Sequence, residues 1–350
     1  MAQVIGGLMA RTDLSADQVE DVVLGNVCQS GEDSRNLARF SALLSGLPEA
    51  VGAQTVNRLC GSSMSAALDV ARAVTVGEGD LFVAGGVESM TRAPFVLGKS
   101  ATACPQFHKD FGSETMPQTA DNLAAEFGLS RDACDLFAAT SQQRFEAARS
   151  GGFFADEITP IEIAGRKGAV ATVAHDEHPR PDTTLGKMAG LRPLDPKGVV
   201  TPANASGIND GAAALLIGRN GLGPAPRGRI LAGAVSGVAP RVMGIGPAHA
   251  IPKALGRAGL TLEQMDVIEI NEAFASQVLA CCAALDIAPD DARLNPNGGA
   301  IAVGHPLGAS GARLILTGLR QLEASGGRYG CLSMCIGFGQ GIAVIIERLK

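Results

Sequence analysis

The sequence lacks any run of like charges, and its 350 residues carry a formal net charge of −6. This balance argues against nucleic acid or an anionic membrane surface as the main partner. No apolar run approaches the ~18 residues of a membrane span, and the first residues lack the basic start and cleavage pattern of a secretory signal. These absences leave small molecules as the expected ligands and predict a cytosolic location.

Cysteine pairs of the CxxC type are also missing, although the chain has eight cysteines. Most of them lie in apolar surroundings, so neither disulfides nor a zinc site are expected. Tryptophan is absent and tyrosine occurs once, whereas glycine occurs 45 times. So much glycine predicts tight turns and close backbone approaches. The stretch "GHPLGASG" fits neither the dinucleotide-binding nor the P-loop pattern, which disfavours both kinds of site.

Apolar runs typical of buried strands alternate with segments of helical spacing, which predicts an α/β fold. The middle of the chain, 92–208, differs because it mixes helical pieces with polar, proline-containing loops, and we interpret it as an insertion. The expected strand segments are 19–27, 79–89, 265–274 and 329–349, and the expected helices are 62–74 and 308–327.

Two parts of the chain resemble each other. The segment "VEDVVLGN" at 19–26 is similar to "QMDVIEIN" at 264–271, which places Asp21 opposite Asp266. At the same separation of 245 positions Cys60 falls opposite His305, and each is followed by small residues and an expected helix. We favour a duplication, with chance similarity of two strand–turn–helix units as the alternative. A duplication would bring a thiol and an imidazole together about a pseudo-twofold axis.

Cys60 precedes the helix expected at 62–74, in the stretch "NRLCGSSMSA". A thiol at a helix start feels unpaired N–H groups and the positive end of the helix dipole, which favour the nucleophilic thiolate. The small residues that follow would let a substrate carbonyl approach backbone N–H groups. The alternative is that Cys60 is one more buried small apolar residue.

Three further segments carry polar groups in apolar surroundings. His305 lies between glycines before a helix, where a neutral imidazole could take the thiol proton or donate to an oxyanion; the alternative is a histidine satisfied in the core. Asn271 and Glu272 end a buried strand, where they either hold a water, a side chain or a substrate, or cap a helix. Cys335 begins a glycine-rich turn that could offer N–H groups to an anion.

Together the segments "NRLCGSSM", "NEAFA", "NGGAIAVGHPLGASGAR" and "CIGFGQG" resemble the thiolase family, the acyl-CoA:acetyl-CoA C-acyltransferases, over residues 2–350. The resemblance implies an α/β fold of two βαβαβαββ halves in an α/β/α/β/α core, with an inserted loop domain that binds coenzyme A. It also implies a homodimer or homotetramer. The halves would be 1–91 plus 209–227 and 228–350, with the loop domain at 92–208.

Carried over by motif, Cys60 would be the nucleophile that accepts the acyl group. His305 would activate Cys60 and, with a water held by Asn271, form one oxyanion hole. The N–H groups of Cys60 and Gly337 would form the second hole, and Cys335 would be the second acid/base. Coenzyme A is a substrate in this chemistry, and neither a metal nor a redox cofactor is implied.

Weaker resemblances concern coenzyme A. They place Arg180 near its adenine or phosphate end and Ser206 near its pantetheine, with Met116 and Phe274 lining the tunnel.

Three departures from the family pattern accompany this resemblance. The chain lacks an initial segment of roughly thirty residues, so we expect a strand to be missing from the first half. Thr115 stands where a histidine is usual, which would alter how the pantetheine is held. Phe338 replaces a small residue, which would alter the acyl pocket.

Several segments, among them "GEDSRNLARF" and "GVAPRVMGIGPA", look similar to thiolases of fatty-acid degradation and of aromatic catabolism, including the β-ketoadipyl-CoA enzymes. A distal carboxylate needs a cation, for which Arg92 and Lys99 are candidates. Synthesis of acetoacetyl-CoA stays open, and so does a non-catalytic coenzyme A-binding relative. The second cysteine disfavours a ketoacyl synthase, and no papain-like signature surrounds Cys60.

Overall fold

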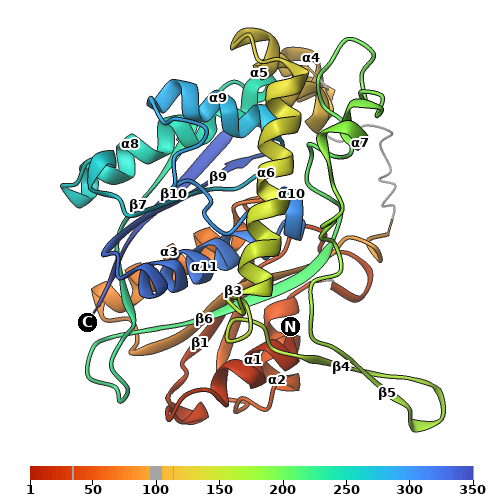
Figure 1. The fold of residues 1–350 in the computed structure, drawn as a ribbon. Coiled ribbons are helices and arrows are strands. Elements are labelled where there is room, and N and C mark those ends of the chain that lie inside the picture. Colours follow the sequence, from red (N-terminus) through yellow and green to blue (C-terminus); the bar gives the residue numbers. More distant parts are fainter. Residues whose placement is uncertain (34, 95–104, 113, 350) are drawn as a thin grey trace.

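The computed structural model describes residues 1–33, 35–94, 105–112 and 114–349, and Figure 1 shows their arrangement in layers. Two mixed sheets lie one above the other with helices between them and on both outer faces. The α/β fold expected from the sequence is confirmed.

The first sheet has the strand order β2-β1-β3-β6. Strand β1 pairs in parallel with both β2 and β3, whereas β6 runs antiparallel to β3. These strands are β1 (Asp21–Gly25), β2 (Gly52–Val56), β3 (Leu81–Ser89) and β6 (Asp210–Gly218).

The second sheet has the order β7-β10-β9-β8. Strand β8 is parallel to β9, and β10 is antiparallel to both β9 and β7. These strands are β7 (Gly228–Gly237), β8 (Val267–Ile270), β9 (Tyr329–Ile336) and β10 (Gln340–Arg348).

The two sheets share one pattern, as the expected duplication requires. In each, two parallel strands, β1 with β3 and β8 with β9, are followed by an antiparallel one, β6 or β10. The sheets differ at the next position. Strand β7 covers the outer edge of β10, whereas no described strand pairs with the outer edge of β6, which lines a cavity of about 1560 Å³. The missing strand expected in the first half stays a prediction.

Helices α3 (Ser62–Val76) and α11 (Ser310–Ser325) form the central layer. Their apolar faces pack with both sheets in one buried cluster that includes Met64, Leu314 and Met334. Helix α11 ends at Ser325 and is capped by Gly326, whose φ of 74° suits the glycine cap expected there. Helices α1 (Ala2–Met9) and α2 (Leu37–Leu44) cover the first sheet, and α8 (Gly246–Ala258) and α9 (Ala275–Leu285) cover the second.

Between β3 and β6 the chain leaves the sheets and forms helices, loops and one projecting hairpin (Figure 1). The boundaries proposed for the three parts of the chain stay a prediction. No described helix is both long and apolar enough to cross a membrane. The elements of this segment are α4 (Pro105–Phe111), α5 (Met116–Glu126), α6 (Arg131–Ser150), β4 (Ile161–Ala164), β5 (Val170–Val173) and α7 (Leu185–Ala189).

Glycine permits the close contact between the two central helices. A Cβ on Gly311 of α11 would lie 2.5 Å from the backbone nitrogen of Met64 in α3. The backbones would therefore have to separate to admit even a methyl group.

Gly311→Ala should lower the free energy of unfolding by about 1–3 kcal/mol, because overpacking outweighs the better helix propensity of alanine. Gly256→Ala in α8 is the matched control, since nothing lies within 4 Å of a Cβ there. It should raise stability by up to about 1 kcal/mol. Urea unfolding of both variants tests this, and equal stabilisation by the two substitutions would contradict the close contact.

Candidate active site

Cys60 lies on a tight turn that leads directly into α3. Leu59 has a φ of 48°, which is unusual for a residue with a side chain and reverses the chain before the thiol. The Ser62 hydroxyl closes the turn, because it accepts a hydrogen bond from the Arg58 N–H at 2.9 Å and donates to the Leu59 carbonyl at 2.6 Å. The turn fixes the thiol at the N-terminal end of the helix.

The surroundings of the Cys60 thiol both favour and oppose the thiolate. The nearby backbone N–H groups of Gly337 and of Cys60 itself lower the pKa of the thiol, but burial has the larger effect and raises the pKa above its ordinary value. The expectation of a net lowering at the helix start is therefore wrong. The thiol is neutral at rest, so a base must remove its proton.

His305 lies on the segment that enters α11. Gly304, with a φ of 98°, turns the chain, and a side chain there would overlap Asn209. The Asn209 side-chain oxygen accepts a hydrogen bond from the His305 N–H at 3.3 Å. His305 is only 5% exposed.

Hydrogen bonds assign the proton of the His305 ring. Its Nδ1 lies 2.6 Å from Ser310 Oγ, and the Ser310 hydroxyl donates to the Pro306 carbonyl at 2.9 Å. The tautomer that satisfies both contacts carries its proton on Nδ1, which leaves a lone pair on Nε2. Burial, with a smaller effect of Arg313, lowers the His305 pKa to about 4. The imidazole is therefore neutral at pH 7 and can act as a base.

Asn271 follows β8 and faces the same imidazole. Its Nδ2 lies 3.5 Å from His305 Nε2, and its backbone N–H donates to the Ser333 carbonyl at 2.9 Å. Its Oδ1 is buried and has no hydrogen-bond partner among the described residues. A buried, unpaired amide oxygen is costly, which favours a polar ligand at this position.

Glu272 holds the segment in place. Its carboxylate accepts hydrogen bonds from the Ser141 hydroxyl at 2.6 Å, the Asn295 amide at 2.9 Å and the Ile301 N–H at 3.1 Å. Ile301 belongs to α10 (Ala300–Val303), and no side chain caps α9, the helix that follows Glu272. Glu272 therefore holds side chains and one N–H of other segments and does not cap the helix at its own strand–helix junction.

Cys335 lies in β9, close to the turn that joins β9 to β10. The thiol is buried in a cluster with Phe274 and Met243, and burial raises its pKa well above the ordinary value, with a further contribution from Cys60. The two sulfur atoms therefore share one region, and both carry their protons at neutral pH. Phe338, with a φ of 62°, forms the turn beyond Gly337.

The coenzyme A candidates divide into two groups. Ser206 lies beside the site, since its N–H donates to the Ala273 carbonyl at 3.0 Å, next to Phe274. The Met116 sulfur is also close, because a Cβ on Gly337 would lie 3.7 Å from it. Arg180 differs, because its guanidinium is exposed and donates to carbonyls of its own loop at 177–179.

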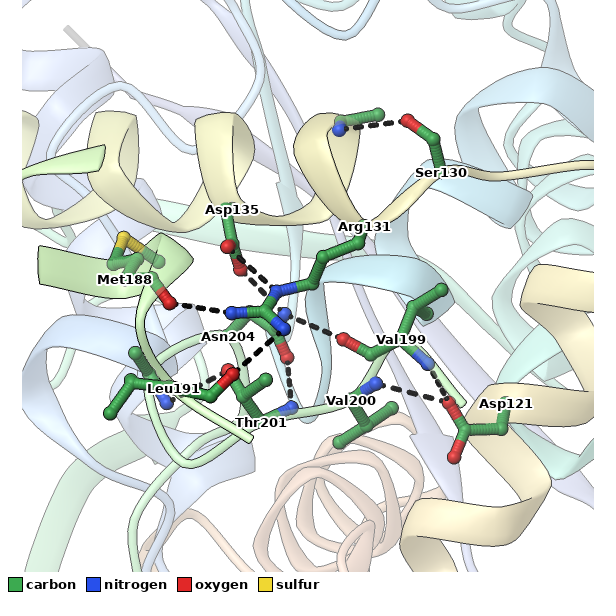
Figure 2. A network of polar contacts seen from close by, with 12 residues as sticks. Asp121, Ser130, Arg131, Asp135, Met188, Leu191, Val199, Val200, Thr201 and Asn204 are labelled. Atoms are coloured by element: carbon green, nitrogen blue, oxygen red, sulfur yellow. Dashed lines mark hydrogen bonds and ion pairs between the residues drawn. The ribbon is translucent and has the colours of Figure 1, made fainter. Parts of the chain in front are cut away.

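The loop before Ser206 is anchored by the polar network in Figure 2. Asn204 Nδ2 donates to Asp135 at 2.8 Å, and its Oδ1 accepts from the Thr201 N–H at 2.7 Å. The Asn204 carbonyl also accepts the N–H of Ala275, which begins α9, at 2.9 Å. One residue thus joins this loop to the segment that follows Asn271.

A salt bridge and hydrogen bonds to the backbone extend this polar network to helices α5 and α6. Arg131 pairs with Asp135 at 2.7 Å and donates to the carbonyls of Met188 and Leu191. Asp121 of α5 accepts the N–H groups of Val199 and Val200. The inserted helices therefore fix the loop from two sides.

Three residues near His305 were missed by sequence reasoning. Glu88 and Asn209 bind backbone N–H groups of the segment that carries His305, and Ser310 bonds to the imidazole. The signal for Glu88 was a charge in the apolar run "LFVAGGVES". Arg92 pairs with Glu32 at 2.8 Å on the surface, and Lys99 lies outside the described residues. No cluster of three or more His, Cys, Asp or Glu side chains suited to a metal occurs in the described ranges.

Comparisons with known proteins address the family. The models for the N-terminal and C-terminal domains of thiolase match residues 1–221 and 225–348. The chain belongs to the thiolase family. The expected thiolase fold is confirmed by human mitochondrial 3-ketoacyl-CoA thiolase, a solved structure that is 40% identical with a TM-score of 0.91, over 100% of this chain and 92% of that one.

Two relatives are similar over nearly the whole chain. A β-ketoadipyl-CoA thiolase of Acinetobacter baylyi is 55% identical, over 95% of this chain and 88% of the relative. A 3-oxoadipyl-CoA/3-oxo-5,6-dehydrosuberyl-CoA thiolase of Escherichia coli is 49% identical, over 98% of this chain and 91% of the relative. The chain is accordingly an acyltransferase of the thiolase family.

The neutral thiol and imidazole predict an unusual pH profile for alkylation of Cys60 by iodoacetamide. Between about pH 5 and 8 the rate should change little, because proton transfer from thiol to imidazole leaves the total charge of the pair unchanged. Below this range the rate should fall as His305, with its pKa of about 4, becomes protonated.

His305→Gln is the comparison, since without an internal base the rate should rise about tenfold per pH unit. Mass spectrometry of the Cys60 peptide measures both profiles. Identical profiles in the two proteins would contradict a role of His305 as base.

Proposed function

We propose that Cys60 is the nucleophile of this thiolase and that its acyl group passes to coenzyme A after cleavage of a 3-ketoacyl-CoA. The proposal is carried by two observations: the backbone N–H of Gly337 acts on the Cys60 thiol, and a buried, neutral His305 faces Asn271. Nucleophile, base and two sets of hydrogen-bond donors are the parts that thioester chemistry needs.

In the first step His305 Nε2 takes the Cys60 proton, and the sulfur attacks the 3-keto carbon. The N–H groups of Cys60 and Gly337 stabilise the oxyanion that forms. The Cα–Cβ bond then breaks, which leaves the acyl group on Cys60 and the electron pair on the acetyl-CoA enolate. His305 and a water held by Asn271 would stabilise the enolate oxygen.

In the second step Cys335 donates its proton to the enolate carbon, which gives acetyl-CoA. The raised pKa of Cys335 suits this task, because the group must arrive protonated. The Cys335 thiolate then takes the thiol proton of free coenzyme A, whose sulfur attacks the thioester and takes the acyl group. The proton on His305 returns to the leaving Cys60 sulfur, which restores the resting enzyme. The reverse sequence condenses two acyl groups, with Cys335 as the base.

The substrate we propose is a 3-ketoacyl-CoA with a distal carboxylate, as in β-ketoadipyl-CoA. The names of the two curated relatives support this choice. Arg92, one candidate cation, is 71% exposed in its ion pair with Glu32, and Lys99 stays the other. Formation of acetoacetyl-CoA is the alternative within the family, supported by a solved acetyl-CoA acetyltransferase of Bacillus anthracis that is 36% identical.

Finer features of this function are also proposals. Ser206, Met116 and Phe274 would line the pantetheine path, since each lies beside Gly337 or Ala273. Arg180 would meet the adenine or phosphate end. The homodimer or homotetramer and the cytosolic location stay predictions. A catalytically impaired relative is disfavoured because the set of Cys60, His305, Asn271 and Cys335 is intact.

Substitutions of the two cysteines should block different steps of the reaction. Cys60→Ser should reduce thiolysis by about three orders of magnitude or more and prevent labelling by acyl-CoA. Cys335→Ala should reduce thiolysis by about 10²–10⁴-fold yet still accept an acyl group on Cys60, because only proton transfer to carbon is lost. Intact-mass measurement of the acyl enzyme separates the two steps.

Cys331→Ala, another buried thiol of β9, is the control and should keep thiolysis. Acylation of the Cys60→Ser protein, or full thiolysis by Cys335→Ala, would refute the corresponding assignment.

A distal carboxylate should be preferred over a neutral chain end. We expect kcat/KM for 3-ketoadipyl-CoA to exceed that for 3-ketohexanoyl-CoA by at least about tenfold, because a site built for a charged group rejects an analogue without it. Loss of the enolate absorbance measures both reactions. Equal values would contradict the proposed substrate and leave the thiolase activity itself intact.

A further inference from the structure

Glu88 is a buried carboxylate at the end of β3 that takes no part in the chemistry described above. The residue is 1% exposed. Its Oε1 accepts the Cys28 N–H at 2.9 Å, and its Oε2 accepts the Val27 N–H at 3.0 Å and the Gly308 N–H at 2.8 Å. Three backbone donors thus converge on one buried charge.

These donors come from opposite halves of the molecule. Val27 and Cys28 follow β1 of the first sheet, whereas Gly308 lies three residues after His305 and just before α11. Hydrogen bonds to a buried carboxylate are stronger than those between neutral groups, and loss of the acceptor would leave three N–H groups unpaired. Glu88 is therefore a polar link between the half that carries Cys60 and the segment that carries His305.

The backbones at this link are in direct contact. A Cβ on Gly86 would overlap the Gly308 carbonyl oxygen, and a Cβ on Gly308 would lie 2.6 Å from the Val87 carbonyl and 2.8 Å from the Gly25 carbonyl. Without side chains between them, the segment of His305 rests on the ends of β1 and β3. A shift of this segment would carry the imidazole with it.

We infer that Glu88 is a positioning residue, which sets the imidazole of His305 against the thiol of Cys60 by holding the N–H of Gly308. The inference rests on the proposed roles of Cys60 and His305. It assigns Glu88 no contact with substrate. A displacement of about 1 Å at a catalytic base can lower the rate about a hundredfold. Correct placement of His305 can therefore outweigh the cost of burying the Glu88 charge.

The charge of Glu88 should also affect the alkylation rate of Cys60, in the direction opposite to the effect of positioning. This difference makes the inference testable. Its charge contributes to the raised pKa of Cys60, and it raises the pKa of the neighbouring Cys28 and Asp33 as well. If the charge alone mattered, its removal would make the Cys60 thiol more acidic and faster to alkylate. If positioning matters, the same removal would displace the base and slow alkylation.

The experiment compares Glu88→Ala and Glu88→Gln with the wild-type protein. For Glu88→Ala we expect kcat of thiolysis to fall about 10–100-fold with little change in KM for coenzyme A, and alkylation of Cys60 at pH 7 to slow. Glu88→Gln should lie between Glu88→Ala and wild type, since its amide oxygen can still accept from Val27 and Gly308. It also serves as the test variant if Glu88→Ala does not fold.

Asn36→Ala is the matched control for lost stability. Asn36 caps α2 and bonds to Ala53 and Thr55, on the outer side of the first sheet. This variant should melt at a lower temperature but keep kcat and the alkylation rate.

Faster alkylation in the Glu88 variants, or a fall in kcat no larger than that of Asn36→Ala, would overturn the inference. If the wild-type protein itself showed no thiolysis, the proposed function would fail, and the alkylation rates would still decide the role of Glu88.

Discussion

The first turns of helices α3 and α11 pack with their backbones in direct contact, and this contact holds the two halves of the candidate site together. Gly311 admits the backbone of Met64, and the Ala312 N–H donates to the Ser63 hydroxyl at 2.9 Å. Because Cys60 precedes one helix and His305 the other, any separation of the helices would separate thiol and imidazole. The abundance of glycine is thus a requirement of the site as well as of its turns.

Burial decides the resting protonation of the site. It raises the pKa of both Cys60 and Cys335 and lowers that of His305 to about 4, so all three groups are neutral at pH 7. A neutral site avoids the cost of a buried charge until substrate arrives. In the proposed mechanism, charge then develops beside donors that are already in place, namely the Gly337 N–H and the Asn271 amide.

Much of the fold and of the candidate site could be predicted from the sequence, because apolar periodicity and short motifs are local features of the chain. The apolar periodicity and the composition predicted α3, α11 and β8–β10. Of the residues in the four motifs, the structure places Asn271 against His305 and brings Cys60 near Gly337 and Cys335. The edge strand β2, "GAQTV", was missed because it is short and only partly buried. The sign of the Cys60 pKa shift could not be predicted, since it is set by the burial of the thiol in the folded protein. The role of Glu88 could not be predicted either, since only folding brings Gly308 near this carboxylate.

The most direct measurement of the central claim is cross-linking of Cys60 to Cys335 with the short bifunctional reagent dichloroacetone, followed by peptide mass spectrometry. Convergence of the two halves predicts one linked pair of peptides, which contains these two cysteines and disappears in either Cys→Ser variant. Separate modification of the two thiols, or links that join Cys60 only to other cysteines, would contradict the convergence on which the site depends.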